Sequence, residues 1–159
     1  MLRVAIVLAL ARVAAAAPCS APENRQFDFF AGDWDAFEGG KLVAHNHVTP
    51  MLDGCAIREV YDGVDGNHGE SFSTYDAGRR VWHQSWVTNH GQVLLLDGHL
   101  EGNRMILTAT ETAADGTSWL VRGVWIPGGD GVREIADRSY DHGKTWKPWF
   151  DITFRPHKA

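Results

Sequence analysis

Several signatures that commonly mark an enzyme or a membrane protein are missing from this sequence of 159 residues. It has no C-x-x-C, no H-E-x-x-H and no regularly spaced set of carboxylates, the patterns typical of protein metal sites. It has no G-x-S-x-G motif, which disfavours hydrolysis by a serine on a nucleophile elbow. Its apolar runs are far shorter than the roughly 20 residues that a membrane-spanning helix needs. We therefore expect no membrane span. A run of basic residues is also absent, so we expect no nucleic-acid partner.

The first 16 residues have the composition of an export signal. Met1-Leu2-Arg3 is a short positive start, an apolar stretch follows, and Ala14-Ala15-Ala16 fits a cleavage site. We therefore expect residues 1–16 to be a signal peptide and residues 17–159 to form one periplasmic or secreted domain. Loss of the leader removes Arg3 and Arg12, so the net charge falls from −5 to −7. An acidic domain repels DNA and anionic membranes.

The sequence contains two cysteines, Cys19 and Cys55. In an oxidising compartment an even pair predicts a disulfide, which would close a loop of about 37 residues and stabilise the fold by about 4 kcal/mol. The alternative is a catalytic thiol, which would require a free and activated cysteine. The sequence favours the disulfide.

Helical periodicity is nearly absent after the leader, whereas short β-rich runs alternate with turns containing Gly, Asp and Asn. The predicted strands are 34–37, 42–48, 56–61, 70–75, 81–87, 92–96, 104–110, 119–126, 132–140 and 146–155. No connection is long enough for a crossover helix, so we expect an all-β, antiparallel and mostly up-and-down arrangement. About ten strands in one domain favour a closed barrel, because closure removes exposed edges. A two-sheet sandwich or jelly roll is the alternative. We also expect residues 27–30 to form a short helical turn that plugs one end.

The segment from Ser139 to Trp146, SYDHGKTW, resembles the Asp-box, a hairpin found in sialidase blades and other β proteins. Its Asp141 can accept hydrogen bonds from backbone N–H groups, and Gly143 suits a position with positive φ. We expect Trp146 to pack as an anchor at the start of the next strand. The motif indicates architecture and no chemistry.

A second resemblance covers essentially all of residues 17–159. Residues 27–35, FDFFAGDWD, resemble the F-D-F-W-x-G-x-W-x-V opening of a bacterial family of exported proteins of unknown function. Further matches are 53–59, 75–76, 82–86, 139–146 and 150–151. The resemblance implies a calycin barrel, lipocalin-like or nitrobindin-like, and carries no established reaction. It also implies that Trp34 closes the barrel bottom against an arginine, Arg155 or Arg138. Phe30 replaces a frequent Trp, and Ile152 a usual Gly.

The stretch from Val81 to Val87 alternates strictly, with Trp82, Gln84 and Trp86 on one face. If that face points inward, two indoles and one amide line a lumen, which is typical of a small-molecule pocket. The alternative is that these side chains only fill the core. The residues that we predict to bind a ligand are Trp34, Tyr75, Trp82, Gln84, Trp86, Arg122 and Trp125.

Charged residues also stand within apolar strands, and any that face inward need a partner. They are Arg58, Glu59, Arg122, Arg133, Glu134 and Asp151. An acid–base pair such as Glu59 with Tyr75 would suit a cofactor-free isomerase, cyclase or lyase. No spacing marks such a pair, so catalysis is an alternative to simple binding.

Metal and haem are further alternatives, although we expect no cofactor. His45 and His47 point the same way on a strand and could chelate one ion. A third ligand could come from His68, His83, His90 or His99. The nitrobindin-like resemblance implies a haem ligated by one histidine, with His83, His90 or His99 as candidates. The leading hypothesis is an exported barrel that binds a small apolar or aromatic ligand, and the sequence does not indicate an oligomeric state.

Overall fold

Ten strands follow one another along the chain; two short 3₁₀ segments precede the first strand, and a third lies between the second and third strands. The computed structural model describes residues 17–158, so the predicted signal peptide lies outside the described residues. The strands are β1 (Gly32–Glu38), β2 (Lys41–Met51), β3 (Ala56–Gly63), β4 (His68–Asp76), β5 (Val81–Thr88), β6 (Val93–Glu101), β7 (Arg104–Thr112), β8 (Ser118–Gly128), β9 (Gly131–Ser139) and β10 (Lys147–Pro156). The 3₁₀ segments are η1 (Pro22–Arg25), η2 (Asp28–Phe30) and η3 (Leu52–Gly54). Within this part of the chain, no helix has the length and apolar character needed to cross a bilayer.

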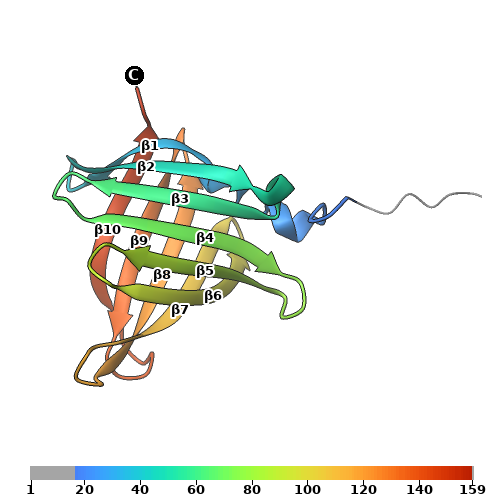
Figure 1. Cartoon of the computed structure of the whole chain (residues 1–159). Coiled ribbons are helices and arrows are strands. Elements are labelled where there is room, and N and C mark those ends of the chain that lie inside the picture. The colour runs from blue at the N-terminus through green and yellow to red at the C-terminus, as the bar shows by residue number, and fades with distance from the viewer. Residues whose placement is uncertain (1–16, 159) are drawn as a thin grey trace, which may run out of the picture.

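The strands form a single closed barrel. Each strand pairs antiparallel with its neighbour in sequence, and β1 pairs with β10, from Trp34 opposite Pro156 to Glu38 opposite Ile152. Figure 1 shows the resulting shape, in which β2 to β6 cross in front of β8 to β10. The predicted all-β, up-and-down barrel is confirmed, and the sandwich alternative is wrong, because pairing of the first and last strands leaves no sheet edge.

Side chains alternate between the lumen and the outer surface, as the pleat requires. On β2, for example, Ala44 and Val48 are buried inside the barrel while His45 and His47 are exposed. On β5 the buried residues are Trp82 and Gln84, so the inward face is the one that alternation marked. Every second residue of a strand therefore faces the lumen, and these positions can be identified from the alternation in the sequence.

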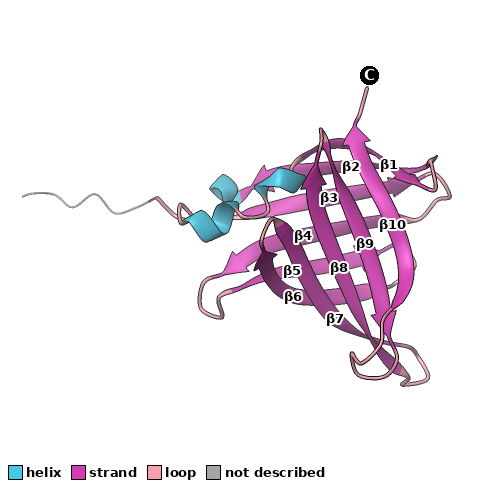
Figure 2. Ribbon diagram, turned by 180° about the vertical axis from the view of Figure 1, so that it is seen from behind, coloured by secondary structure: helices cyan, strands magenta, loops and turns pink. Residues whose placement is uncertain are grey.

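A plug closes one end of the barrel. The segment containing η1 and η2 lies beside this end (Figure 2), and Phe27, which precedes η2, is fully buried. Its ring meets those of Trp82 and Trp125 edge-on, with centroids 5.7 and 5.4 Å apart. The predicted short helical turn over residues 27–30 is confirmed, because η2 is that turn and its aromatic rings fill the end of the lumen.

A disulfide between Cys19 and Cys55 ties this plug to the start of β3. The predicted pairing is confirmed, and the described chain has no free cysteine that could act as a nucleophile.

The predicted role of Trp34 is only half right. The Trp34 side chain is buried at the plugged end, where its indole N–H donates to the Phe30 carbonyl at 2.9 Å. Neither implied arginine stacks on it. Arg155 lies over Phe37, because residues 35, 37 and 155 share the outer face, whereas Arg138 lies over Trp149 near the opposite end.

The loop between β9 and β10 has the expected Asp-box hydrogen bonds. Asp141 accepts from the backbone N–H of Thr145 at 2.8 Å and from the hydroxyl of Ser139 at 2.8 Å. Gly143 has a φ of 85°, the left-handed conformation that glycine permits. Trp146 packs under the guanidinium of Arg122, 4.2 Å from the ring centroid, and so anchors the loop immediately before β10.

Candidate functional site

The lumen contains a cavity of about 420 Å³ at the end opposite the plug, within the size range of small-molecule pockets. Residues from seven strands and two turns line it: Glu38, Glu59, Tyr61, Asp65, Asn67, Gln84, Trp86, Gln92, Leu94, Leu96, Val121, Gly123, Trp125, Glu134, Ala136, Trp149, Phe150 and Ile152. The mouth is formed by residues at the ends of strands and in turns, among them Glu38, Asp65 and Gln92. The cavity is therefore a pocket with one open end.

Aromatic rings form much of the cavity wall. Trp86 meets Tyr61 edge-on at 6.1 Å between centroids, and Trp149 packs against Phe150 at 5.1 Å. Gly69 on β4 makes room for Trp86, because a Cβ at this position would overlap the indole ring. The wall is thus shaped by a glycine as well as by the aromatic residues themselves.

Glu59 is the buried polar centre of the cavity. It points inward from β3 and accepts hydrogen bonds from the Ser71 hydroxyl at 2.8 Å and the Asn46 amide at 3.0 Å. The Gln84 amide in turn donates to Ser71 at 3.3 Å. Burial raises the pKa of Glu59, and the two hydrogen bonds only partly oppose this effect.

Glu134 is a second carboxyl group in the same cavity, on β9. Burial raises its pKa well above the usual value, the nearby Glu59 raises it further, and the Trp125 indole lowers it. The side chain retains some exposed surface, which faces the cavity that it lines. The Trp125 N–H makes no hydrogen bond of good geometry within the protein, so it is a buried donor next to the cavity.

The remaining charges around the cavity are also mostly acidic. Glu38 and Asp65 stand at the mouth. Burial raises the pKa of Tyr61 to about 12, and the charges of Asp65 and Glu38 add to this rise. No lysine or arginine is among the described residues that line the cavity. The nearby Arg138 lies 3.6 Å from the centroid of Trp149, on whose ring it stacks, and pairs with Glu111 at 3.0 Å. Its positive charge is therefore already neutralised.

The structure brings only some of the predicted ligand-binding residues together. Gln84, Trp86 and Trp125 line the cavity. Trp34, Trp82 and Tyr75 lie at the plugged end, where Trp82 contacts Phe27 and Tyr75. Arg122 is on the outer face of β8, paired with Asp137 at 2.8 Å, because its position alternates with the inward Val121 and Gly123.

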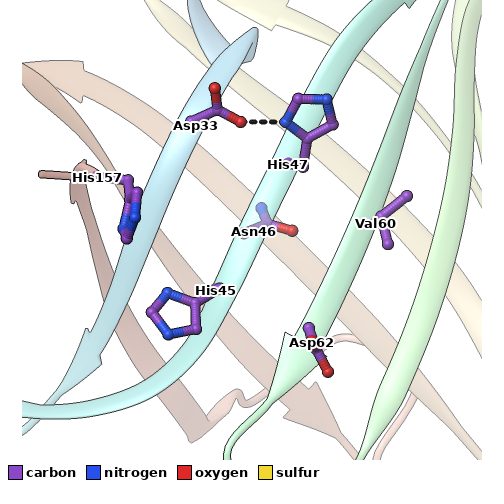
Figure 3. A pocket seen from close by; sticks show the side chains of 7 residues that line it. All are labelled: Asp33, His45, Asn46, His47, Val60, Asp62 and His157. Carbon is purple, nitrogen blue, oxygen red and sulfur yellow. Dashed lines mark hydrogen bonds and ion pairs between the residues drawn. The ribbon is translucent and has the colours of Figure 1, made fainter. Parts of the chain in front are cut away.

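A second cluster of functional side chains lies on the outside of the barrel, over β1, β2 and the residues after β10. Figure 3 shows His45 and His47 projecting from one face of β2, with His157 beside them. The Nδ1 atoms of His45 and His157 lie 2.7 and 2.8 Å from the same Asp35 oxygen. His47 is paired with Asp33 instead. His45 and His47 therefore belong to two adjacent groups.

The other histidines considered for a metal or haem lie apart from the lumen. His83 is on the outer face of β5 next to Asp97, His90 is in the turn after β5, and His99 contacts Glu101 on the surface. His68 pairs with Asp62 at 2.6 Å. The cavity therefore offers haem iron no histidine ligand from the described residues.

Sequence reasoning did not identify that two carboxyl groups line the same cavity. Glu59 and Glu134 each occupy an inward position by the alternation of their strands, and that alternation was the available signal. Their place in one cavity depends on strands that are far apart in the chain. The cavity-lining Tyr61, Trp149 and Phe150 were missed for the same reason.

The comparisons with known proteins add no assignment, since no family model and no curated protein matches this sequence. The closed ten-stranded antiparallel barrel is compatible with a calycin-like fold, and the site rests on its own geometry.

Proposed function

We propose that this protein binds a small molecule with an apolar or aromatic body in the open end of its barrel. The observation that carries the proposal is the cavity of about 420 Å³, walled by Trp86, Trp125, Trp149 and Phe150. Such a wall removes apolar surface from water and stacks on a flat ring. The Gln84 amide and the Trp125 N–H supply the few directional contacts that fix orientation.

The disulfide between Cys19 and Cys55 supports a place of action in an oxidising compartment such as the periplasm or the extracellular medium. The predicted signal peptide at residues 1–16 is consistent with this location. A carrier or scavenger of small molecules outside the cytoplasm is the role that fits a one-ended barrel.

The test uses the neutral aromatic dye N-phenyl-1-naphthylamine, whose fluorescence rises in an apolar site. We expect saturable binding that weakens at least about tenfold in Trp86→Ala and Trp125→Ala, since each indole contributes stacking and burial. Phe72→Ala is the matched control, because Phe72 is an exposed aromatic residue on the outer face of β4. Binding that is unchanged in both Trp variants would place the dye outside the lumen and contradict the proposal.

General acid–base catalysis is the second candidate function, and the carboxyl pair favours it. Burial raises the pKa of both carboxyl groups, and the charge of Glu59 raises that of Glu134 further, so Glu59 can accept a proton while Glu134 still holds one. A direct probe is the base-promoted ring opening of 5-nitrobenzisoxazole, in which a carboxylate removes the C3 proton as the N–O bond breaks. We expect turnover above that of free acetate, lost in Glu59→Gln or Glu134→Gln. A rate equal to acetate, or one that survives both substitutions, would contradict this candidate.

A further inference from the structure

The charges around the cavity restrict the class of ligand that it can take. Two carboxyl groups, Glu59 and Glu134, face the interior of the pocket, and two more, Glu38 and Asp65, stand at its mouth. A negatively charged ligand would meet four acidic groups and no free base among the described lining residues. An anion would therefore be repelled by the charges at the mouth, and inside it would meet no basic group among the lining residues.

The aromatic wall adds an attraction for positive charge. Rings of Tyr61, Trp86, Trp125 and Trp149 border the same space as the carboxyl groups. A cation over the face of such a ring is attracted by the ring quadrupole, more strongly where water is excluded. Aromatic rings combined with a carboxylate are the groups that recognise an ammonium centre.

We infer that the ligand is an organic cation, an amine or quaternary ammonium compound with an apolar or aromatic body, whose charged nitrogen lies between Glu59 and Glu134. This inference rests on the proposed function, because it concerns the same lumen. The nitrogen lies next to the two interior carboxyl groups, and the apolar body contacts Trp86, Leu94 and Ile152. In the empty pocket, hydrogen bonds from Ser71 and Asn46 hold Glu59 in place.

Binding of a cation should be coupled to the release of a proton. Burial and mutual proximity raise the pKa of Glu134, so this carboxyl is protonated in the empty pocket at a higher pH than usual. An ammonium group favours the ionised carboxylate, so its affinity rises with pH through that raised pKa. The other titratable groups that face this site are Glu38, Glu59, Tyr61 and Asp65, and all are acids. Arg138, packed behind Trp149, is paired with Glu111.

The test compares three probes that share one ring and a similar short tail: 2-phenylethylamine, the neutral 2-phenylethanol and the anionic phenylacetate. Binding is followed by ¹H–¹⁵N chemical-shift changes of the tryptophan indole N–H groups, which report on the lumen. We expect the amine to bind at least about tenfold more tightly than the alcohol, and phenylacetate not to bind. We also expect amine affinity to rise with pH through the raised pKa of Glu134 while alcohol affinity stays constant.

Substitutions separate this inference from the proposed function. Glu134→Gln and Glu59→Gln should each reduce the ratio of amine to alcohol affinity toward one, whereas Glu70→Gln, on the outer face of β4 beside Arg58, should preserve it. Equal affinity for amine and alcohol would overturn the cation inference and leave the ligand-binding function intact. Shifts in lumen tryptophans with none of the probes, and no dye binding, would overturn both.

A second inference stands on a different observation, the cluster of Asp35, His45 and His157 on the outside of the barrel. Atoms of these three side chains that can bind a metal all lie within 4.8 Å of one another. They come from three segments held by backbone pairing: Asp35 is the cross-strand partner of His45, and the His157 N–H donates to the Asp33 carbonyl at 2.9 Å. The fold, and not sequence proximity, assembles the group.

We propose that Asp35, His45 and His157 bind a divalent transition metal such as Zn²⁺. Two imidazoles and one carboxylate are a ligand set that Zn²⁺ accepts, with further positions left for water or substrate. The carboxylate is the most enclosed of the three, with 21 % of its side chain exposed, against 53 % for His45 and 45 % for His157. An ion can therefore reach the site from solvent and find a carboxylate already oriented by both rings.

Calorimetric titration with Zn²⁺, together with the visible absorption of bound Co²⁺, tests this site. We expect one saturable site whose affinity falls at least about tenfold in His45→Ala and in His157→Ala. His47→Ala is the matched control, because His47 is the next outward residue on β2 and pairs with Asp33. Absence of saturable Zn²⁺ binding, or an equal loss in His47→Ala, would overturn the proposal.

Discussion

Replacing Glu134 by glutamine should stabilise the protein at neutral pH, by an amount that depends on pH. In the unfolded chain this carboxyl ionises near its ordinary pKa of 4.5, whereas burial and Glu59 raise the pKa in the folded state. Between these two values the unfolded chain has lost a proton that the folded chain keeps, so the free energy of unfolding falls as pH rises. One proton corresponds to about 1.4 kcal/mol per pH unit. Below the unfolded pKa both states are protonated and the cost is absent.

The measurement is urea unfolding of wild type and Glu134→Gln, followed by tryptophan fluorescence between about pH 4 and pH 8. The difference in free energy of unfolding should grow with pH in favour of the variant and then level off above the folded pKa. Glutamine keeps the shape of the protonated acid and, like it, offers both a donor and an acceptor, so packing is conserved. A difference that is the same at every pH would refute the assignment of Glu134 as a buried, protonated carboxyl.

Asp151→Asn provides a control of opposite sign. Arg133 lowers the pKa of Asp151, so the ion pair stabilises the folded state above the unfolded pKa of 3.8 and its contribution is lost as pH falls. The variant should be less stable than wild type at neutral pH and approach it in acid. Both substitutions remove one acid, so a general effect of net charge would change the free energy of unfolding with pH in the same direction in both variants. Opposite pH dependences therefore report the local environment of each acid.

Three further predictions concern the plug, the cavity wall and the Asp-box loop. Cys19→Ser with Cys55→Ser should lower the free energy of unfolding by about 4 kcal/mol, from the loop that the disulfide closes, and unchanged urea unfolding would contradict this. Gly69→Ala should weaken dye binding in a fluorescence titration, because the new Cβ displaces the Trp86 ring. Gly128→Ala is the control, since its new Cβ would point into open space, and an equal loss of binding in both variants would refute the argument. Asp141→Ala should lower the melting temperature at neutral pH without changing dye binding. Hydrogen bonds with Thr145 and Ser139 lower the pKa of Asp141 to about 2, so the stability that its carboxylate contributes is lost as pH falls from 3.8 toward 2. A difference in melting temperature that persists at this low pH would contradict the role given to the Asp141 carboxylate.

The strands and the barrel were predictable because their signals are local. Each of the ten predicted runs corresponds to one observed strand, since alternation and turn residues are read within a few neighbours. Closure followed from the number of strands and the absence of crossover helices. The inward face of β5, where Trp82 and Gln84 are buried, was also predictable, because side chains alternate between the two faces of a strand.

The composition of the cavity was only partly predictable. Alternation assigns a residue to a face, but it does not give the height of that residue along the barrel. Trp82 and Trp86 share one face of β5, yet Trp82 packs on the plug and Trp86 lines the cavity, because the strand runs from one end of the lumen to the other. The approach of His157 to Asp35 depends on the pairing of β10 with β1, which no local pattern encodes.

The pairing of β1 with β10 has a consequence for how the chain reaches its final shape. The two strands that close the barrel are the first and the last in sequence, so β1 must wait for residues 147–156 before its free edge is covered. Until then the open edges of β1 and β9 can pair with another chain, as exposed strand edges do. Contacts between such distant residues slow folding, since a long loop must be closed first. We therefore expect folding to be limited by this final closure, and truncation within β10 to produce aggregation in place of a smaller stable barrel.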